Sequence, residues 1–237
     1  MTGLRAPLLP VLFTVVFSAC EPGQRPLHDA SDSGVADSST ASDSIDGLVR
    51  LARERLQDMT GDGEPERFTV AARGPRMDSL GVVLEIHSSD GNLLYQDAWN
   101  SRLYFQYVDR DEIPDSTAER QVQEHIEALL ADDSFRPTPQ VRPNTPLLGE
   151  AEMREAIRYS TAEAIWREQH GLPVADTLPH AAFGKIGVIS VPAARVDRLF
   201  REISAKPSFS YFAGGEATYA IVWSEAEQRF VTVFACC

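Results

Sequence analysis

The segment between Asp58 and Glu66 carries side-chain oxygens at regular spacing along a short stretch that favours turns. The candidate ligands at its positions 1, 3, 5, 7 and 9 are Asp58, Thr60, Asp62, Glu64 and Glu66, with Glu64 contributing its backbone carbonyl. Alternate oxygens on a tight loop can converge on one hard cation, and Gly63 supplies the sharp turn at position 6. The spacing predicts a calcium site with an affinity of about 10⁻⁴–10⁻³ M, the range of extracellular modules. The competing interpretation is a turn without metal, because Gly, Asp and Pro favour turns for conformational reasons.

Two known families of calcium loop share parts of this pattern. A helix predicted before the loop makes it similar to an EF-hand, but Thr69 occupies position 12, where that motif has a bidentate glutamate. The segment resembles more closely the Asp-x-Asx-x-Asp-Gly-x-x-Asp loop of FG-GAP and VCBS-type repeats, although Thr60 and Glu66 replace the usual Asx and Asp. That resemblance implies calcium bound between strands, in a role that braces a fold outside the cytoplasm. With one copy of the loop, it does not imply a β-propeller.

A second group of candidates is aromatic. Five such residues fall within thirteen positions, namely Tyr95, Trp99, Tyr104, Phe105 and Tyr107. They would form either a stacking surface for a sugar or another planar ligand, or the cross-strand packing of one hairpin. Tyr95 and Trp99 share one face of a strand, as do Phe105 and Tyr107, and this spacing favours packing.

The adjacent residues Cys236 and Cys237 follow a strand-like run. Neighbouring side chains of a strand point to opposite faces, so a bond between these two cysteines needs a distorted chain end. In an oxidising compartment a strained disulfide is favoured over two free thiols. A copper or zinc site is the third interpretation, although no histidine lies beside the pair in the sequence.

The sequence contains no motif typical of a known catalytic mechanism. His-Glu-x-x-His, Gly-x-Ser-x-Gly and phosphate-loop patterns are all missing. Ser160, His170 and His180 could meet only through the fold, and the acidic residues of the helix predicted around them are expected on its solvated face: Glu152, Glu155 and Glu163. We therefore expect a non-enzymatic binding or structural role. The alternative is a hydrolase of the cell envelope whose site is assembled from dispersed His, Glu and Ser residues.

Residues 1–19 have the composition of an export signal, with Arg5 as the only charge before an apolar run too short to span a bilayer. The tetrapeptide from Phe17 to Cys20 resembles a bacterial lipobox, with Phe17 where the family usually has Leu. The resemblance implies cleavage before Cys20, acylation of that cysteine (diacylglycerol and palmitate-type chains) and a lipid-anchored protein of the cell envelope. Glu21 would favour the periplasmic face of the outer membrane in a Gram-negative bacterium. The alternative is a secreted protein with a free thiol.

Charge and composition restrict the partners and the domain organisation. The 237 residues contain 22 Lys and Arg against 35 Asp and Glu, a net charge of −13, which excludes nucleic acid as a partner because phosphate binding needs a basic surface. Residues 20–44 are rich in Ser and Asp and are expected to form a disordered tether. Residues 45–237 are expected to form a single domain, with an internal boundary in the Pro-rich segment 135–146. The sequence identifies no protein or glycan partner.

The hydrophobic periodicity predicts strands in an N-terminal and a C-terminal block, with helices between them. Helices are predicted over residues 45–56, 117–131, 150–170 and 192–203. Strands are predicted over residues 68–72, 80–86, 93–99, 103–108, 185–191, 208–212, 217–224 and 229–236, with a hairpin turn at Asp90-Gly91. Such blocks indicate an α+β fold in which antiparallel sheets pack with three to four helices.

Overall fold

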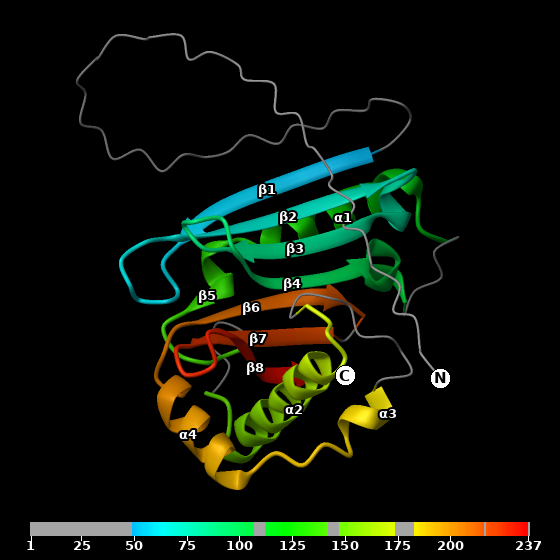
Figure 1. Ribbon diagram of the computed structural model, residues 1–237. Coiled ribbons are helices and arrows are strands. Elements are labelled where there is room, and N and C mark those ends of the chain that lie inside the picture. Colours follow the sequence, from blue (N-terminus) through cyan, green and yellow to red (C-terminus); the bar gives the residue numbers. More distant parts are fainter. Residues whose placement is uncertain (1–48, 107–111, 142–146, 174–182, 216, 237) are drawn as a thin grey trace, which may run out of the picture. The chain divides into compact units, whose positions relative to one another are not determined.

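A computed structural model describes residues 49–106, 112–141, 147–173, 183–215 and 217–236 of the chain. All of these residues belong to one compact unit, Ser38–Cys237. The fold is α+β, as expected, with two four-stranded antiparallel sheets and their helices (Figure 1). The expected signal segment and tether lie outside the described residues, as do Cys20, Tyr107, His180 and Cys237.

The N-terminal sheet has its strands in sequential order. They are β1 (Val49–Gln57), β2 (Glu66–Gly74), β3 (Gly81–His87) and β4 (Leu93–Asn100). Helix α1 (Asp115–Ala128) packs on the inward face of this sheet, as its predicted apolar stripe requires. The resulting core includes Phe68, Val70, Leu84, Ile86, Val122 and Ile126.

The helix predicted over residues 45–56 is wrong, because the described part of this segment forms β1. The apolar residues fit a helical period, but burial alternates: Leu51 is 5% exposed, whereas Arg50 and Ala52 are exposed. An isolated helix of this length is marginal in water, whereas β1 pairs with β2 along all nine of its residues. Long-range pairing therefore overrides the local pattern.

Two predicted strands are also wrong. After β4 the chain turns at once into a 3₁₀ helix, η2 (Ser101–Phe105), because the Asn100 side chain accepts a hydrogen bond from the backbone N–H of Arg102. Residues 183–186 form a short helix, α3 (Phe183–Ile186), where a buried strand was expected over residues 185–191. An apolar run cannot by itself distinguish a strand from a buried turn of helix. Here Ile186 packs against Trp166 while Val188 is 80% exposed, so only one side of the segment is covered.

The C-terminal sheet has the order β5 (Phe135–Arg136), β6 (Ser208–Gly214), β7 (Ala217–Ser224) and β8 (Arg229–Cys236). One face joins the core of the N-terminal sheet through Phe209, Tyr211, Ile221, Trp223 and Phe230. The other face packs against helices α2 (Glu150–Gln169) and α4 (Ala193–Ile203), which lie side by side against it in Figure 1. This sheet therefore forms the middle layer of the fold.

Most of the remaining predictions are confirmed. Helices α1, α2 and α4 occupy the expected segments, and so do strands β2, β3, β4, β6, β7 and β8. The Pro-rich segment 135–146 contributes the two-residue strand β5. No helix in the described ranges is long and apolar enough to cross a bilayer.

Candidate functional site

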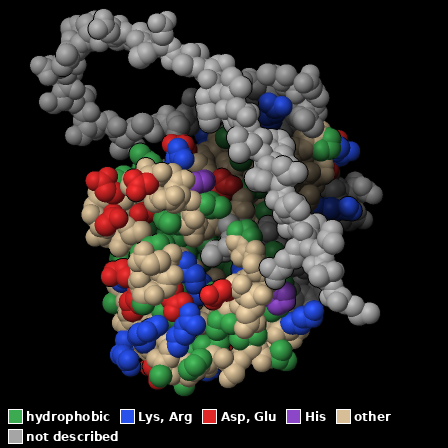
Figure 2. Space-filling view, viewed as in Figure 1, with side chains coloured by type: hydrophobic (Ala, Val, Ile, Leu, Met, Phe, Trp, Pro, Cys, Tyr) green, Lys and Arg blue, Asp and Glu red, His purple; other side chains and the backbone are tan. Residues whose placement is uncertain are grey.

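The loop between β1 and β2 brings three carboxylates together. One oxygen from each of Asp58, Asp62 and Glu66 lies within 4.8 Å of the other two. Figure 2 shows acidic side chains gathered on the left side of the molecule, where Figure 1 places this loop. Three acidic groups at this separation could hold a metal ion.

Backbone amides and one hydroxyl orient the carboxylates of the loop. Glu66 is 2% exposed, and it accepts hydrogen bonds from the N–H of Met59 (2.7 Å) and the hydroxyl of Thr60 (2.8 Å). Asp58 accepts from the N–H groups of Gly61 (2.7 Å) and Gly63 (3.1 Å). These donors offset the negative charge and fix the rotamers, so the loop can keep its shape without an ion.

The backbone of the loop depends on two glycines. Gly61 and Gly63 have φ angles of 81° and 91°, which L side chains rarely adopt. The side chain of Asp62 accepts from the N–H of Glu64 (2.8 Å), whose own side chain is exposed. The loop connects two strands, so the helix expected before it, and with it the likeness to an EF-hand, is overturned.

The aromatic candidates pack into the interior of the fold. Trp99 and Phe105 are buried, so neither has an exposed face on which a ligand could stack. The Trp99 indole donates to the Tyr104 hydroxyl (3.0 Å), and Tyr104 stacks on His125 with ring centroids 4.7 Å apart. Tyr95, the remaining aromatic candidate in the described part of the chain, contacts the hydroxyl of Tyr211 instead.

A chain of hydrogen bonds that the sequence analysis missed runs from Tyr95 through Tyr211 to Asp97. The hydroxyls of Tyr95 and Tyr211 are 2.7 Å apart, and Tyr211 donates to a carboxylate oxygen of Asp97 over 2.7 Å. A phenol has one proton, so Tyr95 must donate to Tyr211 when Tyr211 donates to Asp97. The alternation of Tyr95 and Asp97 along β4 was the available local signal, but the partner is 114 residues from Asp97.

Burial perturbs every group in this chain. It raises the pKa of both tyrosines well above 10.0. It also raises the pKa of Asp97 above 3.8, although hydrogen bonds from Tyr211 and from the N–H of Ala98 act in the opposite direction. Shifted titration is typical of functional sites and also of buried structural networks.

Helix α2 presents an ion pair to the same region. Arg167 donates to Glu163 over 2.8 Å, and the charge of Glu163 adds to the raised pKa of Asp97. Glu152 and Glu155 are exposed, as expected for a solvated face, but the Glu163 side chain is only 28% exposed.

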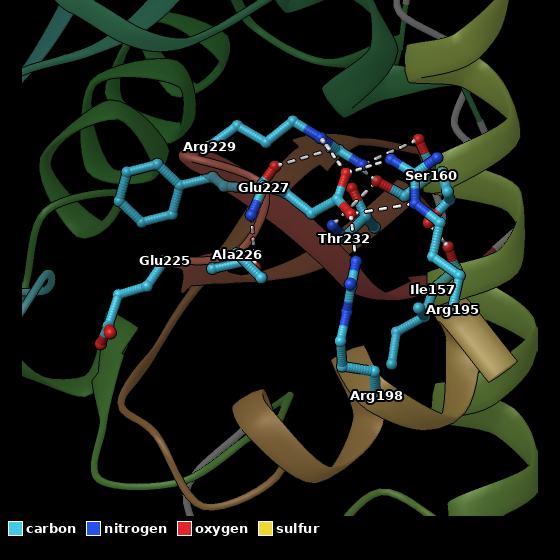
Figure 3. A network of polar contacts seen from close by, with 12 residues as sticks. Ile157, Ser160, Arg195, Arg198, Glu225, Ala226, Glu227, Arg229 and Thr232 are labelled. Carbon is cyan, nitrogen blue, oxygen red and sulfur yellow. Dashed lines mark hydrogen bonds and ion pairs between the residues drawn. The ribbon is translucent and has the colours of Figure 1, made fainter.

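Ser160 occupies a structural position between α2 and β8, seen close by in Figure 3. Its hydroxyl oxygen accepts from Arg229 (3.2 Å) and from the N–H of Thr232 (3.2 Å). His170 stacks on Trp166, with ring centroids 4.1 Å apart, and its Nδ1 contacts the Trp166 carbonyl. The contacts found for Ser160 among the described residues therefore include no histidine.

Glu227 is the centre of the arginine network in Figure 3. It pairs with Arg195, Arg198 (3.5 Å) and Arg229 (4.0 Å). Burial alone would raise the pKa of Glu227, but the hydrogen bond from Arg195 and the three positive charges lower it below 4.5. Burial lowers the pKa of the Arg229 guanidinium, a shift that the charge of Glu227 opposes.

Cys236 is disulfide-bonded. Cys20 and Cys237, the other two cysteines of the chain, both lie outside the described residues. The bond between Cys236 and Cys237 therefore stays a prediction.

No protein family matches the sequence, and no curated protein and no solved structure matches it.

Proposed function

We propose that the protein is a lipid-anchored protein of the cell envelope, with a non-enzymatic binding or structural role and one calcium ion bound in the β1–β2 loop. The observation that carries the metal part is the convergence of Asp58, Asp62 and Glu66 within 4.8 Å. The lipobox-like segment before Cys20 supports the anchor. The ion would brace the hairpin that begins the folded domain.

The donor set favours calcium over a transition metal. The loop offers carboxylate, hydroxyl and carbonyl oxygens and contains neither His nor Cys, the donors that zinc and copper prefer. Calcium accepts six to eight oxygens in flexible geometry, so Thr60, the Glu64 carbonyl and water can complete the set. Magnesium requires a stricter octahedron of short bonds, which suits this loop less well.

Thermal unfolding of the mature protein in calcium or in chelator tests the metal site. If the dissociation constant is about 10⁻³ M, then about 10 mM calcium stabilises the folded state by about 1.4 kcal/mol. For a domain of this size that free energy raises Tm by roughly 3–6 °C, and magnesium should produce a smaller rise. An unchanged Tm in calcium would refute the metal site.

The variant Asp62→Asn isolates the role of charge. It keeps the oxygen that accepts from the N–H of Glu64, so the loop should keep its shape while the calcium-dependent rise in Tm disappears. Asp90→Asn, at an exposed position in the turn between β3 and β4, is the matched control and should keep that rise. A rise that survives in Asp62→Asn would place the calcium effect elsewhere.

Replacing Cys20 with Ala tests the anchor. The expected result is release of the protein from membranes, because acyl chains supply the attachment and each buried methylene contributes about 0.8 kcal/mol. A variant that still fractionates with lipid would contradict lipidation at this residue.

A further inference from the structure

A cavity of about 170 Å³ lies beside β6, at the point where β5 ends. Strand β5 pairs with β6 only through Phe135 and Arg136. The preceding residues form a 3₁₀ helix, η4 (Asp132–Ser134), where a longer strand would have continued the pairing. The last turn of α1 forms another wall, so the space left by the short strand is enclosed on several sides.

Arg136 lines this cavity, and one nitrogen of its guanidinium is unsatisfied. Its Nε is buried and has no hydrogen-bond partner. Among the described residues no ion pair of Arg136 is found, although Asp133 lines the same cavity. A buried N–H without a partner costs free energy, so native proteins satisfy almost all such groups with protein, water or ligand. An acceptor inside the cavity would satisfy this one.

The remaining walls indicate the size and chemistry of that acceptor. Leu129, Val141, Tyr211 and Phe212 provide apolar surface. A cavity of about 150 Å³ holds a ligand the size of benzene, so this space fits a molecule of that order. The planar fork of a guanidinium matches a carboxylate, with which it forms two parallel hydrogen bonds.

His125 is a second polar group in the wall, and it is held in place. Its Nδ1 lies 2.7 Å from the carbonyl oxygen of Gln121, and its ring stacks on Tyr104. Since a carbonyl can only accept, Nδ1 carries a proton, and in the neutral tautomer with that proton Nε2 is an acceptor. Nε2 of His125 and the carboxylate of Asp133 could both accept a hydrogen bond from a ligand that carries a donor.

We propose that this cavity binds a small carboxylate with an apolar body, and that Arg136 holds the carboxylate group. The site requires neither the calcium loop nor the lipid anchor, because none of its walls belongs to β1, β2 or the loop between them. A negative result for carboxylate binding can therefore be distinguished from a negative result for the calcium site or the lipid anchor.

Isothermal titration of the mature protein with four probes tests the ligand class. Benzoate and phenylalanine both carry a carboxylate on an apolar body and should bind. Benzylamine lacks the carboxylate and inorganic phosphate lacks the apolar body, so neither should bind measurably. Failure of both carboxylates to bind, or equal affinity for benzylamine or phosphate, would overturn the proposal.

Arg136→Met tests the proposed contact between Arg136 and the ligand carboxylate. The change keeps approximately the same side-chain length and removes the charge and the hydrogen-bond donors. Affinity for benzoate should fall about tenfold or more, the typical effect of losing a hydrogen bond to a charged group. The unfolding curve without ligand should stay unchanged, since among the described residues the Arg136 side chain has no hydrogen bond or ion pair that the change would remove. Arg73→Met, at an exposed position on β2, is the matched control and should leave the affinity unaltered. Benzoate binding that is equal in the wild type and in Arg136→Met would contradict the site.

Discussion

The chain from Tyr95 through Tyr211 to Asp97 predicts a graded response to the loss of single hydroxyl groups. Tyr211→Phe removes one oxygen but breaks both hydrogen bonds, one of them to a carboxylate. Tyr95→Phe leaves the bond to the carboxylate intact and breaks only the one between phenols. The two variants remove the same group from Tyr211, in the core between the sheets, and from Tyr95, which is partly buried and packs against that core.

The expected magnitudes follow from the kind of bond that is lost. A hydrogen bond to a charged group contributes about 1.5–3 kcal/mol, and one between neutral groups about 0.5–1.5 kcal/mol. Tyr211→Phe should therefore lower the free energy of unfolding by about 3 kcal/mol, and Tyr95→Phe by about 1 kcal/mol. In a domain of this size the corresponding decreases in Tm are roughly 6–12 °C and 2–4 °C.

The cost of Tyr211→Phe should also depend on pH. Burial raises the pKa of Asp97 above 3.8 in the folded state. At pH values between 3.8 and this raised pKa, the folded state therefore binds more protons than the unfolded state. The contribution of Asp97 to stability therefore falls as pH rises through this window. The carboxylate form needs the Tyr211 hydroxyl most, so the deficit of the variant should be largest at neutral pH and should shrink toward pH 3.8.

Urea unfolding of the wild type and both variants, at neutral and at mildly acidic pH, measures these differences. An unchanged m-value shows that the comparison concerns stability alone. Two outcomes would refute the reasoning: an equal cost for both variants at neutral pH, or a cost of Tyr211→Phe that does not change on acidification.

Two further predictions concern other parts of the fold. Glu227→Gln leaves the buried charge of Arg229 without its carboxylate and should cost about 3 kcal/mol at neutral pH. Because the pKa of Glu227 is lowered below 4.5, its stabilisation is present above that value and is lost as pH falls through the lowered pKa. The wild type and this variant should therefore converge in acid in urea unfolding, and a constant difference would contradict the role assigned to the charge. Gly214→Ala places a Cβ at a φ of 96° and 2.7 Å from the Cβ of Leu103, and should cost at least about 2 kcal/mol in thermal unfolding. Gly184→Ala, where nothing lies within 4 Å, is its control, and equal effects of the two changes would contradict the steric argument.

The elements that could be predicted are those with a local signature. The alternation around Phe68 and the apolar stripe of α1 each specify one period. The helix prediction for residues 49–56 is wrong because Leu51 and its apolar neighbours fit both the helical and the strand period. The pairing of β1 with β2 decides between the two. The buried strand predicted over residues 185–191 is wrong because only one side of this apolar segment is covered in the fold.

The candidate sites divide in the same way. The acidic cluster could be predicted because its three carboxylates lie within nine residues of sequence. The hydrogen bond between Tyr95 and Tyr211 joins residues 116 positions apart, and only the packing of the two sheets brings them together. The cavity beside Arg136 likewise depends on the short length of β5, which no local sequence pattern predicts.

The charges of β1 have a consequence for how the protein behaves among copies of itself. Among the described residues this strand pairs only with β2, so within that part of the chain its other side is a sheet edge, to which a second chain could pair. Arg50 and Glu54 are exposed along it, and Arg55 reaches across to the backbone carbonyl of Leu130 beyond α1. Such charges make it costly to add another strand, which opposes aggregation through this edge. The apolar residues of this segment gave it a helical period, whereas its charged residues disfavour pairing at the sheet edge.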